Sequence, residues 1–172
     1  MDAASDGPIL YRHRTVMPPA MLALLLVPAL VPLVILAATL AGGGPRPPTV
    51  ALVVLVVSPV VLVALALLLR VLAVTVTAER VHVRCGPWGP DIPVEAIARC
   101  AAVDYDWREY GGWGIRRGRD GTTVYNMMGD LGRATEIVHR QGGAERRVLV
   151  GTRDPASLVA AIERARALHR AR

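Results

Sequence analysis

The chain has 172 residues, of which 53% are hydrophobic and 20% are charged, and its formal net charge at pH 7 is +6. It is too apolar for a single ordinary soluble domain, in which about 45–50% of residues are apolar even when glycine is included. The excess is confined to one region. Arg46 is the only charged residue between positions 16 and 69, whereas residues 72–172 carry 16 arginines and 12 acidic residues. The composition therefore divides the chain into a membrane part and a polar part the size of one small domain.

Two long uncharged runs predict a transmembrane helical hairpin within residues 16–71. The first span is expected at about residues 18–41 and the second at about residues 50–70. At a rise of about 1.5 Å per residue, roughly 20 helical residues cover the hydrocarbon thickness of a bilayer. The intervening "GGGPRPPT" combines glycine and proline, which end one helix and allow another to start. Residues 1–15 are expected to form a cytoplasmic N-terminal segment.

Charges at the ends of the two runs predict the orientation of the hairpin. Arg12 and Arg14 precede the first span, and Arg70 follows the second. The link contains Arg46 alone. Because cytoplasmic loops are enriched in basic residues, we expect a multi-pass protein of the cytoplasmic membrane with both termini in the cytoplasm. A cleaved signal peptide is the alternative for the first run, but we favour retention because a second run follows it directly.

From residue 72 the hydrophobic pattern has a period of two, which is typical of β-strands. "LAVTVT" and "RVHVRC" flank a short turn and predict a β-hairpin directly after the second span. "QGGAE" predicts a glycine-containing hairpin loop between the last two strands. Further strands are expected at residues 100–106, 122–128, 134–140 and 146–150.

The last segment predicts an amphipathic helix over residues 155–170. Asp154 is a favourable N-cap residue, and Pro155 suits the first helical position. Leu158 and Ile162 belong to an apolar stripe at helical spacing, with glutamate and arginines on the other side. Such a stripe must pack on another element. We therefore expect the helix to cover the open mouth of a strongly bent sheet.

Three segments of the polar part resemble those of a known protein family: "VTVTAERVHVRCGPWGPDIPVEAIARC", "GGWGIR" and "VLVGTRDPASLVAAIERA". Together with the two preceding spans, the chain from Tyr11 to Arg170 resembles bacterial, actinobacterial-type membrane proteins with a PH-like domain. The resemblance implies a membrane-anchored α+β fold, in which the N-terminal two-helix transmembrane hairpin is followed by a domain at residues 72–172. That domain is implied to be a PH-like antiparallel β-barrel of about seven strands, capped by the C-terminal α-helix. The family implies no established enzymatic activity.

The stretch "REYGGWGIRRGRDGTT" contains the candidate contacts with a partner or with lipid. Glycines on both sides of the tryptophan permit positive φ angles and close approaches. The indole has two interpretations, packing on a sheet corner or anchoring at a membrane interface. The arginines stand among glycines, are too polar to be buried, and suit phosphates or an acidic partner. The candidate residues are Trp113, Arg116, Arg117 and Arg119, whereas Trp88 in "GPWGP" is expected to pack within its turn.

No catalytic, metal or cofactor site is expected. Asp104 and Asp106 would share one strand face and could act with His139 in an acid–base site. We favour the alternative that both are exposed carboxylates whose charge balances that of the adjacent arginines. Cys85 and Cys100 lack the spacing of a zinc site, and we expect both to be reduced and buried. No GK[ST] sequence follows the glycines, which excludes a nucleotide-binding P-loop.

The sequence therefore predicts a non-enzymatic, membrane-anchored module that recruits or regulates a protein partner at the cytoplasmic membrane. The alternative is a sensor of anionic lipid headgroups in the same membrane, acting through the basic Trp/Gly/Arg loop. Nucleic acid suits the sign of the charge, but no recognition helix or RNA-binding motif accompanies it, so nucleic acid is not an expected partner. The identity of the protein partner and the oligomeric state are not predicted.

Overall fold

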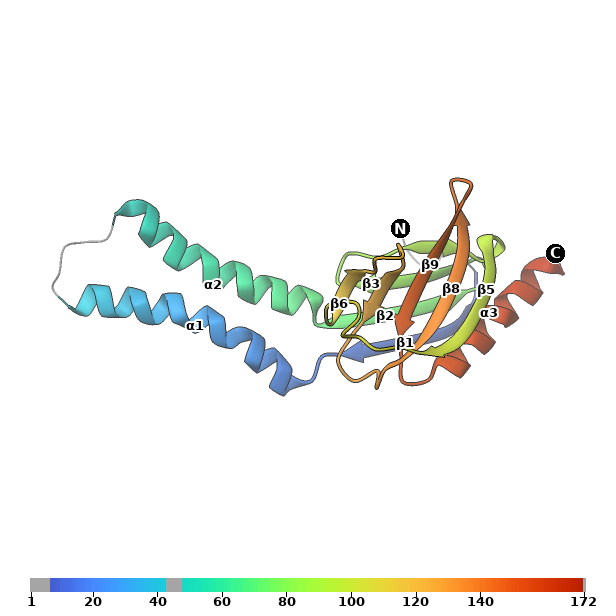
Figure 1. Cartoon of the computed structure of the whole chain (residues 1–172), viewed down its shortest axis with the longest axis horizontal. Helices are drawn as coiled ribbons and strands as arrows, with labels where there is room; N and C mark the ends of the chain where they lie inside the picture. The colour runs from blue at the N-terminus through green and yellow to red at the C-terminus, as the bar shows by residue number, and fades with distance from the viewer. Residues whose placement is uncertain (1–6, 43–47, 172) are drawn as a thin grey trace. The chain divides into compact units, whose positions relative to one another are not determined.

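The computed structural model describes residues 7–42 and 48–171, which have an α+β architecture (Figure 1). These residues form two long apolar helices, two β-sheets and a C-terminal helix. The chain divides into two compact units. The helical unit is Met17–Arg70, and the sheet unit combines the segment that ends at Val16 with the segment that begins at Val71.

The helical unit contains α1 (Pro19–Ala41) and α2 (Thr49–Leu69), which match the two expected spans to within one residue at each end. Both helices are long and apolar enough to cross a membrane. Only 6% of the most apolar window of each helix is buried, whereas the core helix of a soluble protein would be largely buried. The two helices contact each other as a hairpin. Most of the expected link between them lies outside the described residues.

The first sheet of the sheet unit has four antiparallel strands in the order β1-β2-β3-β4. Its second and third strands form the hairpin that the alternating pattern predicts. Leu72, Val74 and Val76 are buried, and the residues between them are half-buried. This alternation arises because successive side chains of a strand point to opposite faces. The strands are β1 (Ile9–Val16), β2 (Val71–Thr77), β3 (Arg80–Cys85) and β4 (Asp91–Pro93).

Strand β1 is absent from the sequence prediction, which assigned no strand to residues 1–15. It pairs with β2 in antiparallel register, with Val16 opposite Val71. The helical unit is therefore an insertion at the tip of a β-hairpin. The signal in the sequence is weak because β1 is an edge strand in which no side chain is fully buried. Only the pairing with β2 reveals its role.

The second sheet has five strands in the order β5-β8-β9-β7-β6. The expected "QGGAE" loop joins β8 to β9, with Gln141 opposite Ala144. A 3-10 helix, Val94–Ala96, connects β4 of the first sheet to β5 of the second. The strands are β5 (Ile97–Asp104), β6 (Gly114–Arg117), β7 (Thr123–Asn126), β8 (Arg133–Gln141) and β9 (Ala144–Gly151).

The two sheets correct the expected barrel. They do not close, since the described strands form two separate ladders, and β7 pairs with β9 in parallel rather than antiparallel fashion. The sequence prediction expected about seven strands and gave ranges for six, and it lacked β1 and the short strands β4 and β6. These three strands are short or lie at sheet edges, where the hydrophobic alternation is least pronounced.

Helix α3 (Pro155–Arg170) has the predicted bounds. The Asp154 carboxylate accepts a hydrogen bond from the Ser157 amide at 3.0 Å, which caps the helix as expected. Leu158 and Ile162 are fully buried, and α3 contacts strands of both sheets. The apolar stripe of the helix therefore completes the core that the two sheets share.

The insertion of the helical unit into a β-hairpin generates a prediction. Replacing residues 18–69 with Asn-Gly should join Met17 to Arg70 by a two-residue turn, because the Met17 amide already donates to the Arg70 carbonyl at 2.9 Å. We expect a monomeric, soluble sheet unit with a cooperative thermal transition. A chain that begins at Val71 should aggregate, because β2 becomes an uncovered edge. Light scattering and circular dichroism distinguish these outcomes, and equal solubility of the two chains would contradict the role of β1.

Candidate functional site

The segment 105–113 between β5 and β6 forms the candidate site around Trp113. Tyr105 and Tyr110 pack against a small cluster of buried side chains on the second sheet, Val124, Ala134 and Leu149. This packing holds both ends of the segment on the sheet. The residues between the two tyrosines are thereby positioned at the end of the strands.

Trp113 is half-buried and stacks on Trp107, with the ring centroids 4.1 Å apart and the ring planes 26° from parallel. The guanidinium carbon of Arg108 lies 4.8 Å from the Trp107 ring centroid, within cation–π range. The stacking agrees with the packing interpretation from the sequence, whereas anchoring at a membrane interface stays a prediction. One face of the indole is packed, and part of the side chain remains accessible to a partner.

A pocket of about 330 Å³ lies beside the stacked indoles. Trp107, Trp113 and Met128 supply apolar surface, and Asp106 and Asp130 supply carboxylates. Aromatic rings offer large apolar surfaces, and the flexible thioether of methionine adapts to apolar groups of varied shape. Carboxylates select hydrogen-bond donors and cations. The pocket has the size and chemistry to accept one side chain of a partner.

Asp130 is the buried polar group of this pocket, with 2% of its surface exposed. It accepts hydrogen bonds from the Tyr105 hydroxyl at 2.5 Å and from the Gly132 amide at 3.0 Å. Burial raises the pKa of Tyr105, and the hydrogen bond to the Asp130 carboxylate raises it further. Leu131, between Asp130 and Gly132, has φ of 59°, a left-handed conformation that costs energy for a residue with a side chain. The Asp130 bonds hold this turn in place.

The three candidate arginines lie along one sheet edge but not on one face. Arg116 and Arg117 are consecutive residues of β6, so their side chains point to opposite faces of the sheet. Arg119 lies in the turn that joins β6 to β7. All three are exposed, and none forms an ion pair with any residue that the structure describes. The structure therefore brings Trp113 and the arginines together as a strand edge, not as a flat basic patch.

The structure does not assemble the acid–base alternative. Asp104 lies opposite Arg133, and His139 lies six residues further along β8, a distance of about 20 Å at roughly 3.3 Å per residue. Asp106 lies beyond the end of β5 and accepts a hydrogen bond from the Arg108 amide at 2.9 Å. His139 is buried, and burial lowers its pKa. Asp104, Asp106 and His139 therefore share no site.

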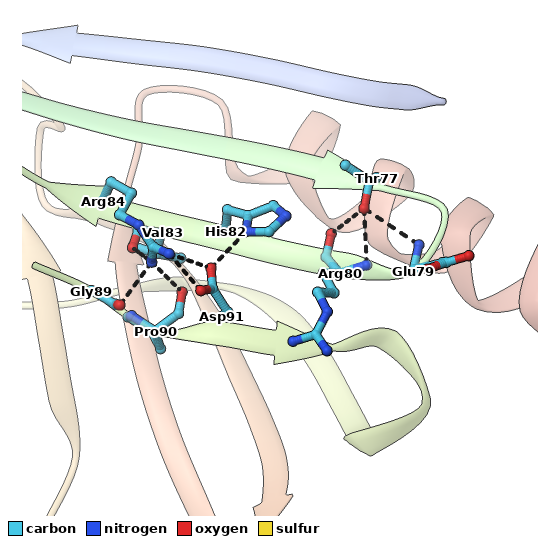
Figure 2. Close-up of polar contacts among 9 residues, drawn as sticks. All are labelled: Thr77, Glu79, Arg80, His82, Val83, Arg84, Gly89, Pro90 and Asp91. Atoms are coloured by element: carbon cyan, nitrogen blue, oxygen red, sulfur yellow. Dashed lines mark hydrogen bonds and ion pairs between the residues drawn. The ribbon is translucent and has the colours of Figure 1, made fainter. Parts of the chain in front are cut away.

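A second polar cluster, which sequence reasoning did not identify, joins β3 to β4 (Figure 2). Arg84 Nη2 lies 2.6 Å and 2.5 Å from the two carboxylate oxygens of Asp91, and His82 Nδ1 lies 2.6 Å from the first of them. The Arg84 guanidinium also donates to the carbonyl oxygen of Gly89 at 2.7 Å. The only signal in the sequence was the spacing of His82 and Arg84 on one strand face. Their meeting with Asp91 depends on the β3–β4 pairing.

The two cysteines form no disulfide. Cys85 is buried and Cys100 is half-buried. Burial and the neighbouring Glu163 carboxylate, to which the Cys100 thiol donates at 3.1 Å, raise the pKa of Cys100 to about 12. Such a thiol is a poor nucleophile and metal ligand at neutral pH. Within the described ranges, no group of three or more His, Cys, Asp or Glu side chains could hold a metal ion.

The fold and these sites define an α+β protein with two membrane-length apolar helices inserted into a sheet unit that carries an accessible strand edge. Comparisons of the chain with protein-family models, with curated proteins and with solved structures found no match. The resemblance to PH-like membrane proteins therefore stays a prediction from the sequence.

Because Asp130 is buried, we expect the Tyr105 hydroxyl that donates to it to contribute to stability. Tyr105→Phe removes a donor and leaves a buried carboxylate oxygen less well satisfied, so the free energy of unfolding should fall by about 1–3 kcal/mol. Urea denaturation followed by tryptophan fluorescence measures this change. Tyr110→Phe is the matched control, because its hydroxyl forms no hydrogen bond within the described chain. An equal loss in both variants would contradict the role of the Tyr105 hydroxyl.

The Arg84–Asp91 cluster predicts a pH dependence. Burial alone would raise the pKa of Asp91, but hydrogen bonds from Arg84 and His82 outweigh it and hold the pKa below its ordinary value. A lowered pKa stabilises the fold above the ordinary carboxyl pKa of about 3.9, and this contribution disappears as pH falls through the lowered value. Asp91→Asn should therefore be less stable than the wild type at pH 6 and approach it at acidic pH.

Thermal unfolding at a series of pH values tests this expectation. Arg84→Gln should reproduce the effect, because it removes the cation that lowers the pKa of Asp91. A stability difference between wild type and Asp91→Asn that stays constant from pH 6 down to acidic pH would rule out this assignment.

Proposed function

We propose that the protein is a non-enzymatic, membrane-anchored binding module that recruits a partner protein at the inner face of the cytoplasmic membrane. The partner contributes an extended acidic segment, which adds to the free edge of β6. The observation that carries this proposal is the edge position of β6, with exposed arginines on both of its faces.

Membrane anchoring rests on the two apolar helices and on the β1–β2 pairing. Because β1 precedes α1 and β2 follows α2, their pairing requires both ends of the helical hairpin to be on the same side of a bilayer. Two spans satisfy this requirement, whereas a single span does not. Arg14 and Arg70 flank the hairpin, and the excess of basic residues at its ends favours the cytoplasmic side.

An edge strand presents unpaired backbone N–H and C=O groups, which can bind an extended peptide as an additional strand. The side chains of such a peptide alternate between the two faces of the sheet. Arg116 and Arg117, on opposite faces of β6, would each meet acidic residues of that peptide. The pocket beside Trp113, at the start of β6, offers a place for one further side chain.

Binding to a lipid surface, the alternative from the sequence, is less favoured by this geometry. A flat layer of headgroups can contact one face of an edge strand, so it would use either Arg116 or Arg117 but not both. A PH-like identity for the sheet unit is also part of the proposal. Two sheets joined by a short 3-10 helix, with a C-terminal helix that contacts both, are compatible with an open variant of that architecture.

Site-specific photocross-linking in the native membrane tests the proposal. We place benzoylphenylalanine at Arg119, at the end of the edge strand, and analyse the adducts by mass spectrometry. A protein adduct at this position is expected, and Arg116→Glu with Arg117→Glu should reduce its yield about tenfold or more, since each charge-assisted contact contributes about 1.5–3 kcal/mol.

The matched control is the double variant Arg140→Glu with Arg164→Glu, which makes the same change of charge at two exposed arginines elsewhere. It should leave the adduct unchanged. A phospholipid adduct at position 119 would favour the lipid alternative. A protein adduct that is insensitive to reversal at Arg116 and Arg117 would contradict binding at the β6 edge.

A further inference from the structure

Trp88 is the one exposed aromatic side chain in the described part of the chain, with 47% of its surface accessible. This exposure corrects the expectation from the sequence that Trp88 packs within its turn. Trp107 and Trp113 stack on each other and are half-buried, so their environment differs from that of Trp88. An exposed indole presents a large apolar surface and one N–H donor, a combination that favours a boundary between water and hydrocarbon.

The turn that carries Trp88 is fixed by its backbone and by Arg84. The Cys85 amide donates to the Trp88 carbonyl at 2.7 Å, and the Trp88 amide donates back at 3.2 Å. Arg84 Nη1 donates to the carbonyl oxygens of Gly89 and Pro90, the two residues that follow Trp88 in the chain (Figure 2). A side chain at Gly89 would place its Cβ 1.9 Å from the Val83 oxygen, so no other residue fits.

These contacts hold the backbone without using the indole. The Asp91 carboxylate of β4 binds Arg84 in turn, so the hydrogen bonds from Arg84 connect the turn to β4. A turn stabilised in this way, with its largest side chain in solvent, presents that side chain at a defined position. The order of the turn therefore points to a contact outside the sheet unit.

The position of the turn within the first sheet indicates which surface outside the sheet unit the indole would contact. The Gly86 amide donates to the Val71 carbonyl at 3.2 Å, and Val71 is the second residue after the end of α2. Val16, opposite Val71 and three residues before the start of α1, is 59% exposed. The turn therefore lies at the end of the first sheet from which both connections to the apolar helices leave.

We infer that Trp88 is an interfacial anchor, which lies at the boundary between headgroups and hydrocarbon of the bilayer that α1 and α2 cross. This inference rests on the membrane insertion in the proposed function and is independent of the β6 partner site. Tryptophan is enriched at this boundary because its ring is apolar and its N–H remains hydrated. Val16 adds apolar surface at the same end of the sheet, and the exposed Arg14 and Arg70 suit lipid phosphates.

Quenching of tryptophan fluorescence by brominated lipid tests the inference with the full-length protein. Neither α1 nor α2 contains tryptophan, so all three indoles report on the sheet unit. The protein is reconstituted into phosphatidylcholine vesicles whose acyl chains carry bromine near the carbonyl groups. Quenching is expected for the wild type, and Trp88→Phe should lose most of it. Trp107→Phe and Trp113→Phe, which remove equivalent fluorophores, should retain it.

Any of the following results would overturn the inference. Equal quenching of wild type and Trp88→Phe, or loss of quenching in Trp113→Phe alone, assigns the lipid contact to another residue. Carbonate-resistant flotation with the vesicles but no quenching of the wild type excludes the anchor and leaves membrane insertion intact. If the protein does not float with the vesicles, both the Trp88 anchor and membrane insertion are excluded. Circular dichroism of Trp88→Phe confirms that the variant is folded, since the substitution leaves the backbone hydrogen bonds of the turn in place.

Discussion

The pairing of β1 with β2 is the constraint on which the rest of the structure depends. These strands are separated by the whole helical unit, yet they align from Ile9 opposite Thr77 to Val16 opposite Val71. Closing so long a loop costs conformational entropy. The helical hairpin reduces this cost, because α1 and α2 contact each other and the Met17 amide bonds to the Arg70 carbonyl where the hairpin closes. The β1–β2 pairing is therefore compatible with the long insertion between the two strands.

The accessible chemistry of the sheet unit lies at its strand edges and turns. The buried residues are concentrated where the two sheets meet α3, and they leave the strand edges and turns to the surface. The edge strand β6 displays arginines on both faces, and the Cys85–Trp88 turn displays an indole. Paired groups hold the backbone next to each surface: Asp130 and Tyr105 hold the turn that lines the pocket beside Trp113, and Arg84 and Asp91 hold the turn that carries Trp88. The backbone of both turns is thereby preorganised.

The candidate site was predictable in part. The mixture of glycine and arginine around Trp113 indicated an exposed, turn-rich segment, and Arg116, Arg117 and Arg119 are exposed. That Arg116 and Arg117 lie on opposite faces required knowledge that β6 is a strand, and four residues are too few for a periodic pattern. The partner of Trp113 was equally hidden. Trp107 is six residues away, and its stacking depends on how the segment between β5 and β6 folds back.

The sequence by itself determined the elements whose signal is local. Two uncharged runs specify α1 and α2, and the cap at Asp154 with the apolar stripe specifies α3 to the residue. Alternation specifies β2 and β3. Only the tertiary structure decided that β1 belongs to the sheet, that β7 runs parallel to β9, and that the sheets stay open. The physical reason is that strand pairing is made by backbone groups, which every residue except proline carries alike, so its register leaves little trace in the side chains.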